Sequence, residues 1–262
     1  MLSKMKYSSL VIVLLAMGLT NCGTKQNSTG STTDEEATVQ VEVTANSENT
    51  LTEQEIADGW KLLFDGKQTT GWRGYNQETL PKAWIVEDGT LKSLGEGGDI
   101  GGDIVYDEVF GEFELYLEWK ISEGGNSGIF YHVLEGEQYH AAYENAPEYQ
   151  VIDDLGFPDK LEDWQSLGAD YAMYVPDQSI KKVKPAGEWN SSRIIFTNEH
   201  VEYWLNGQKT VEFAPWSDDW NERRNSGKWE DKPDYGKAKE GLIGLQDHGS
   251  FIWYKNIKIK KL

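Results

Sequence analysis

Alternating apolar and polar positions run through most of the chain and predict β-strands. The clearest case is FELYLEWKI at residues 113–121, where every second side chain is apolar, as in a strand with one buried face. The stretches SSRIIFT and FIWYKNIKIK predict two further strands. EYWLNGQKTVEF predicts a hairpin, because Asn206 and Gly207 suit a two-residue turn. The pattern therefore favours a chain built mainly from strands.

Helical periodicity is almost absent from the sequence. Residues 52–55, Thr-Glu-Gln-Glu, form a capping box that predicts one short helix ending near Asp58. The rest of the chain predicts about a dozen strands separated by glycine-rich turns. About 210 residues of β structure in one run are typical of a single all-β domain, either a two-sheet sandwich or a jelly roll.

Two long segments, residues 154–188 and 214–240, show no periodicity and are rich in Trp, Asp, Lys, Pro and Gly. Loops of this length in a compact domain are usually functional or disordered. Their aromatic side chains favour ordered loops, which either form the rim of a cleft or pack onto the sandwich. These aromatics are Trp164, Trp216, Trp220 and Trp229.

The N-terminal region predicts export. Residues 1–21 combine two lysines with the apolar run VIVLLAMGL, which is too short for a membrane anchor. LTNC then matches a bacterial lipoprotein signal in which Cys22 is acylated; an ordinary secretory signal is the alternative. Residues 22–50 are polar and predict a flexible tether, so the single folded domain is expected at residues 51–262. The protein is expected to be lipid-anchored, in the periplasm or on the outer-membrane surface.

Cysteine content and charge narrow the picture further. Cys22 is the only cysteine, so no internal disulfide can form and the fold must rest on core packing. A net charge of -19 argues against nucleic-acid partners and leaves the lipid as the only membrane attachment. Eleven Trp and thirteen Tyr are consistent with a carbohydrate partner, since pyranose faces stack on aromatic rings, but most of the tryptophans are expected simply to fill the core.

The sequence APEYQVIDD at residues 146–154 carries an unusual polar row. Glu148 and Gln150 share one face of the predicted strand, and a bulge would add Asp153 to that face. Each unpaired buried polar group costs about 1–3 kcal/mol, so the row must be hydrogen-bonded or used. GxGxxG, P-loop, CxxC, HExxH and GxSxG motifs are absent from the chain, which leaves this row as a leading candidate for chemistry.

The Glu-x-Gln-x-x-Asp spacing resembles the catalytic strand of laminarinase- and lichenase-type glycosidases, in which three carboxylates line a cleft. Here the middle residue is Gln150 and the last is the shorter Asp153. A retaining glycosidase needs two carboxylates about 5–5.5 Å apart, and an amide is neither nucleophile nor acid. Asp153 could still act with Glu148, but ordinary double displacement is disfavoured.

Three other polar clusters lie on or beside predicted strands. The first cluster, GGNSGIFYHV, has glycines that let a ligand approach the backbone. The second, EWNSSRIIF, contains Arg193, which could clamp a sugar or pair with Glu148. The third, GLQDHGSFIWY, contains His248, a candidate general base or metal ligand. A tight turn, a salt bridge and a turn-stabilising histidine are the corresponding structural alternatives. The candidate sugar-binding residues are Asn126, Tyr131, Trp189, Asn190, Gln246, Trp216 and Trp220.

Several blocks taken in order resemble the 3-keto-disaccharide hydrolase domain family. They span residues 57–262 and include GWKLLFDGKQTTGWRGY, GGDIVYDEVFGEFELYLEWKISEGGNSGIFYHV, PEYQVIDD, KPAGEWNSSRIIF and GLIGLQDHGSFIWYKNIKIK. The resemblance implies a concanavalin-like jelly roll with a cleft and long loops on its concave face, as in exported lipoproteins of Bacteroidetes-type bacteria. It also implies a glycoside substrate whose C3 hydroxyl has been oxidised to a ketone.

A 3-keto substrate would explain the missing carboxylate. The ketone acidifies the C2 proton, and the C1 substituent lies β to the carbonyl, so a base can expel the aglycone by elimination, with or without later addition of water. His248 or Glu148 would be the base. Arg193, Gln150 or a bound divalent ion would stabilise the enolate oxygen.

The remaining polar residues have supporting roles in this hypothesis. Asp153 and Asn126 would orient sugar hydroxyls, and Glu148 with Asp153 would suit a hard divalent cation, although the sequence requires no cofactor. Two other functions stay open. A conventional β-glucanase of the laminarinase type is disfavoured by Gln150, whereas a non-catalytic carbohydrate-binding lipoprotein would use the same fold.

Overall fold

The computed structural model describes residues 47–98 and 102–262. The predicted signal, Cys22 and most of the predicted tether lie outside the described residues. The folded unit begins slightly before the expected boundary, because Asn49 is buried and pairs with Asn256: each side-chain oxygen accepts from the other's backbone N–H, at 2.6 and 2.8 Å. The helices in residues 47–98 and 102–262 all lack the length and hydrophobicity of a transmembrane segment.

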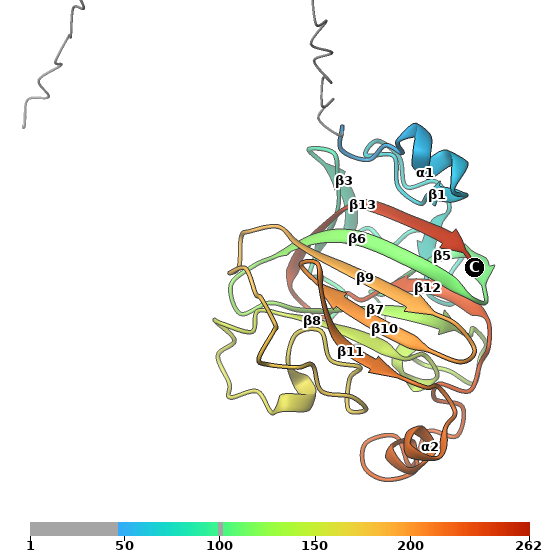
Figure 1. Cartoon of the computed structure of the whole chain (residues 1–262). Helices are drawn as coiled ribbons and strands as arrows, with labels where there is room; N and C mark the ends of the chain where they lie inside the picture. Colours follow the sequence, from blue (N-terminus) through green and yellow to red (C-terminus); the bar gives the residue numbers. More distant parts are fainter. Residues whose placement is uncertain (1–46, 99–101) are drawn as a thin grey trace, which may run out of the picture. The chain divides into compact units, whose positions relative to one another are not determined.

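Two antiparallel sheets form the domain, and Figure 1 shows them stacked as layers. The larger sheet has the order β11-β10-β9-β6-β13-β4-β3, with β1 paired to β13. Its strands are β1 (Trp60–Leu62), β3 (Trp84–Glu87), β4 (Thr90–Leu94), β6 (Phe113–Ile121), β9 (Asn190–Phe196), β10 (Val201–Leu205), β11 (Gln208–Phe213) and β13 (Phe251–Lys261). The smaller sheet has the order β2-β5-β12-β7-β8. Its strands are β2 (Trp72–Gly74), β5 (Ile104–Phe110), β7 (Asn126–Val133), β8 (Glu148–Ile152) and β12 (Gly241–Leu245).

The core lies between the two sheets and follows the predicted alternation. On β6 the apolar residues at alternate positions from Phe113 to Ile121 are all buried. From the smaller sheet, Tyr149 and Val151 of β8 are completely buried in the same cluster. The side chains between them in sequence, at positions 148 and 150, therefore point to the opposite face of the smaller sheet. The predicted all-β sandwich is confirmed.

Local signals in the sequence also produce the expected elements. Helix α1 (Glu53–Ala57) begins at the capping box of Thr52 and Glu55. The β10–β11 hairpin turns at Asn206 and Gly207, whose φ angles of +48° and +77° are those of a tight primed turn.

Helix α2 (Asp218–Arg224) was not predicted. Ser217 caps its N-terminus, acidic residues lie in its first turn, and basic residues lie in its last turn. These end signals are present in the sequence, but only Trp220 and Arg224 of this helix are buried, so no apolar periodicity reveals it. Two short 3-10 helices, η1 (Ala142–Glu144) and η2 (Asp163–Gln165), complete the described elements.

Candidate active site

A pocket of about 220 Å³ opens on the face of the smaller sheet that points away from the core. Strands β7 and β8 and the residues just after β12 supply its polar floor, whereas residues from three connecting segments supply its walls. The long loops at 154–188 and 214–240 both contribute, as a cleft rim would require. The lining residues are Asn126, Tyr143, Glu148, Gln150, Tyr171, Lys228, Trp229, Gln246 and His248.

Three amide side chains present unsatisfied oxygens at this pocket. The side-chain oxygens of Asn126, Gln150 and Gln246 are buried and have no hydrogen-bond partner in the described part of the chain. Gln150 is partly anchored, because its amide nitrogen donates to the carbonyl of Gln165 at 3.3 Å. Since an unsatisfied buried acceptor costs about 1–3 kcal/mol, three together indicate a ligand that donates hydrogen bonds, as sugar hydroxyls do.

Glu148 is the one carboxylate among the described residues that line the pocket. Glu148 is 5% exposed, and its carboxylate lies beside Gly128 on β7, where any Cβ would overlap it. Burial raises the pKa of Glu148 to about 8, with the charge of Lys228 opposing the shift. A carboxylate with this pKa is a much stronger base than an exposed one once it has lost its proton.

Lys228 supplies the positive charge of the pocket and is the one Lys or Arg in the described lining. Its ammonium lies 4.2 Å from the ring centre of Tyr171 and 5.3 Å from that of Trp229. Cation–π contacts of this kind hold a lysine in place without neutralising its charge. Lys228 can therefore stabilise a negative oxygen that develops in the pocket.

His248 lies at the end of the pocket formed by the residues after β12. The turn that carries it is anchored by buried Asp247, whose carboxylate accepts from the backbone of Gly97 at 2.9 Å and of Gly249 at 3.1 Å. The backbone N–H of Asp247 donates to Asp103 at 3.0 Å, and burial raises the pKa of Asp103 to about 7. These bonds fix the backbone on both sides of the imidazole.

Two predicted catalytic residues lie elsewhere. Arg193 is on β9 of the larger sheet, where it pairs with Glu114 through a 2.7 Å hydrogen bond and lies over the ring of Trp204. The structural salt bridge is therefore the alternative that forms, and the possible pairing with Glu148 is wrong. Asp153 follows the end of β8 and does not join the face of Glu148 through a bulge. Its carboxylate instead accepts from the backbone of the β6–β7 turn and of its own loop, at 2.9 and 3.1 Å. Asp153 is therefore not placed to hold a divalent cation together with Glu148, as it would have had to if a metal were present.

Of the predicted sugar-binding residues, only Asn126 and Gln246 line the pocket. Each of the other five has a structural contact. Tyr131 accepts a hydrogen bond from Tyr203 in the core, and Trp220 is buried on α2. The ring of Trp189 lies beside the ammonium groups of Lys120 and Lys255. Asn190 is hydrogen-bonded to the backbone of Lys184, and the indole of Trp216 donates to the carbonyl of Gly236. Sequence reasoning overlooked four lining residues: Tyr143, Tyr171, Lys228 and Trp229, the last noted only as a loop aromatic.

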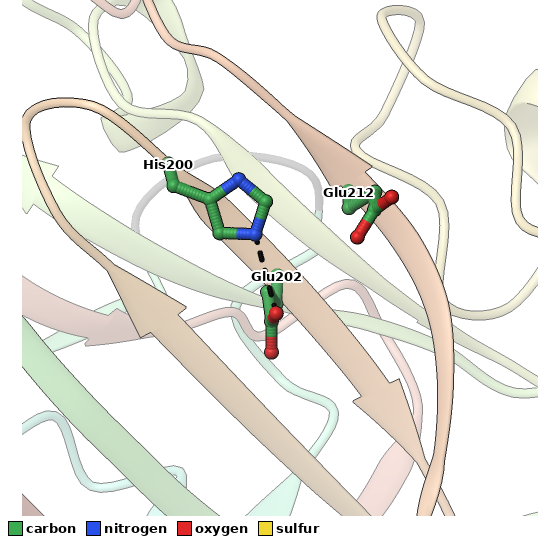
Figure 2. Close-up of side chains that lie close together, drawn as sticks. All are labelled: His200, Glu202 and Glu212. Carbon is green, nitrogen blue, oxygen red and sulfur yellow. Dashed lines mark hydrogen bonds and ion pairs between the residues drawn. The ribbon is translucent and has the colours of Figure 1, made fainter.

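One cluster away from the pocket has the composition of a metal site. His200, Glu202 and Glu212 lie at the edge of the larger sheet (Figure 2), and their potential ligand atoms are within 4.8 Å of one another. Lys209 already pairs with both carboxylates, and His200 contacts Glu202 at 3.2 Å. This cluster is a surface salt-bridge network. In the pocket, the oxygens of Glu148 and the three amides are the ligands that a hard cation would use.

The fold and the pocket together define a two-sheet β-sandwich protein with a polar pocket on the outer face of its smaller sheet. Residues 59–260 match the model of the 3-keto-alpha-glucoside-1,2-lyase-like domain, and the chain belongs to this family. It is 32% identical to the 3-keto-disaccharide hydrolase of Bacteroides thetaiotaomicron, over 99% of both chains.

Two crystal structures of proposed glycosyl hydrolases from Parabacteroides distasonis are also similar. The first is 47% identical, with a TM-score of 0.77, and the match covers 82% of this chain and 100% of that one. The second is 28% identical, with a TM-score of 0.62, and the match covers 78% and 99%. Family membership and these relatives support a glycoside-cleaving function.

Proposed function

We propose that the protein cleaves glycosides that carry a ketone at C3, and that it does so by removing the proton from C2. The observation that carries this proposal is a pocket with one buried carboxylate, Glu148, facing one cation, Lys228. Conventional retaining hydrolysis needs a second carboxylate about 5–5.5 Å away, which the described lining does not supply. A substrate that brings its own ketone needs only a base, a group that stabilises the enolate, and a proton donor.

The reaction balances as an elimination. The base takes the C2 proton, and the C2–H electron pair forms an enolate on the C3 oxygen. The enolate then returns its electrons to form a C1–C2 double bond, while the C1–O bond breaks and the leaving oxygen takes a proton. If water then adds across the double bond, the sum is hydrolysis. Without that addition, the enzyme is a lyase.

The pocket residues fit these steps. Glu148 is the base, because its raised pKa makes the ionised carboxylate a stronger base than an ordinary one. Lys228 stabilises the enolate oxygen, the role for which Arg193, Gln150 or a divalent ion was considered from the sequence. His248, the other titratable side chain on the polar floor, donates the proton to the leaving oxygen. The three amide oxygens accept hydrogen bonds from the sugar hydroxyls.

A pair of chromogenic substrates tests the function. We expect the protein to release nitrophenol from nitrophenyl 3-keto-glucoside and not from nitrophenyl glucoside. Equal release from both substrates would identify a conventional glucanase, and binding without release would identify a carbohydrate-binding protein. Running each assay with and without a chelator shows in addition whether a divalent cation takes part.

A further inference from the structure

The volume of the pocket limits how much of a glycoside it can enclose. At about 220 Å³ the cavity is smaller than the range of about 300–1,000 Å³ in which drug-sized ligands are buried. If the proposed function holds, one keto sugar ring fills this space, with its C2 beside Glu148. The ring attached to C1 must then lie outside, against the rim.

A row of aromatic rings leads from the pocket to the surface. Trp229 stacks on Tyr235 at 4.0 Å, with the two rings 9° from parallel. The edge contacts then continue from Trp229 to Tyr171 at 6.3 Å and from Tyr171 to Trp164 at 5.2 Å. Trp229 and Tyr171 line the pocket, whereas Trp164 lies beyond it and is 37% exposed.

The position of Trp164 is tied to the pocket by its backbone. Trp164 belongs to η2, and its carbonyl accepts from the N–H of Ala172, next to Tyr171, at 3.3 Å. The carbonyl of the next residue, Gln165, accepts from the pocket amide of Gln150. The ammonium of Lys228 lies 5.9 Å from the Trp164 ring. An exposed indole is thus held beside the pocket mouth rather than placed at random on the loop.

We infer that Trp164 and Tyr171 form a platform for the leaving group, on which the second pyranose ring of a 3-keto-disaccharide stacks. The apolar face of a pyranose suits an exposed indole, and the contact explains why a large aromatic remains exposed at the end of a row whose inner members, Trp229 and Tyr235, are buried. The site would thereby favour disaccharides over glycosides with a small C1 substituent. This inference rests on the proposed function.

A comparison of two substrates separates binding of the second ring by Trp164 from mere structural support of the loop. For Trp164→Ala we expect kcat/KM on a 3-keto-disaccharide to fall about 10-fold, mainly through KM, as the loss of one aromatic stacking contact implies. Activity on methyl 3-keto-glucoside, which has no second ring, should be unchanged. Trp164→Phe should retain most of the disaccharide activity. The matched control is Phe251→Ala, which removes an aromatic side chain that is 48% exposed on the larger sheet. This variant should leave the activity on both substrates unchanged.

Equal losses of activity on both substrates would show that Trp164 only supports the loop. No loss of activity on either substrate would show that the second ring binds elsewhere. Either result overturns the inference. Calorimetric binding of the disaccharide to Glu148→Gln protein, with and without Trp164→Ala, tests the platform independently of turnover. Weaker binding in the double variant supports it, even if the wild-type protein were to leave keto substrates uncleaved and the proposed function failed. Equal binding overturns it.

Discussion

Replacing Glu148 by Gln is expected to lower kcat on a 3-keto-glucoside by about 100-fold or more, which is the usual contribution of a general base. Gln has nearly the same shape, so it fits beside Gly128 and keeps the pocket, but it accepts no proton. The measurement is kcat and KM on nitrophenyl 3-keto-glucoside. Near-normal turnover by this variant would remove Glu148 from the mechanism.

The pH dependence of turnover in the same assay identifies the ionisable group that acts as the base. A base must be ionised, and the pKa of Glu148 is raised to about 8, so kcat/KM of the wild-type protein should rise with pH and level off above about 8. Lys228 lowers this pKa, so Lys228→Met should move the profile to higher pH as well as reduce kcat. If the pH profile of kcat/KM were the same in Lys228→Met as in the wild-type protein, Glu148 would not be the base that it reports.

Stability provides the control for Glu148→Gln. In the folded protein Glu148 keeps its proton up to about pH 8, whereas the unfolded side chain loses it near its usual 4.5. Between these values the folded state binds more protons, so the free energy of unfolding falls as pH rises. Gln has no proton to lose, and the variant should therefore be at least as stable as the wild-type protein at pH 8.

Replacing His248 by Ala is expected to lower turnover of methyl 3-keto-glucoside by about 100-fold or more, because a poor leaving group departs only when protonated. The same variant should be nearly normal on nitrophenyl 3-keto-glucoside, since nitrophenolate is a good leaving group without a proton. The ratio of the two rates therefore reports the role of His248, and not merely its presence in the pocket.

Glu148→Gln is the matched comparison for this experiment. Removal of the C2 proton precedes loss of either leaving group, so Glu148→Gln should be slow on both substrates. If His248→Ala were equally slow on both, His248 would be the base and the two roles would be exchanged. Normal rates on both would remove His248 from the chemistry.

The fold was largely predictable from the sequence because its signals are local. Alternation along β6, the Asn206-Gly207 turn and the capping box at Thr52 each depend on a few neighbouring residues, and each forms as expected. Helix α2 was not predicted, because only Trp220 and Arg224 of this helix are buried. A periodicity test needs more buried positions than one short helix offers.

The site was predictable where a strand fixes the direction of a side chain. Glu148 and Gln150 share a face because β8 is regular, and Asn126 lies on the neighbouring strand β7. Asp153 was misplaced because the strand ends at Ile152 and the chain turns there. Arg193 was misplaced because local sequence does not show which of two sheets a strand joins.

The walls of the pocket could not be predicted by the same reasoning. Tyr171, Lys228 and Trp229 come from long loops whose course depends on tertiary contacts, such as the stack of Trp229 on Tyr235. The lysine that stabilises the enolate in this account is therefore visible only once the loops are placed.

The fate of the hydrogen on C2 distinguishes elimination from direct displacement at C1. A 3-keto-glucoside labelled with deuterium at C2 is cleaved in ordinary water, and the sugar product is weighed by mass spectrometry at early times, with free keto sugar incubated alone to correct for spontaneous exchange. Removal of the C2 proton predicts that the sugar product has lost its deuterium, whether or not water adds afterwards. A product that retains its deuterium would mean direct displacement at C1 and would rule out removal of the C2 proton.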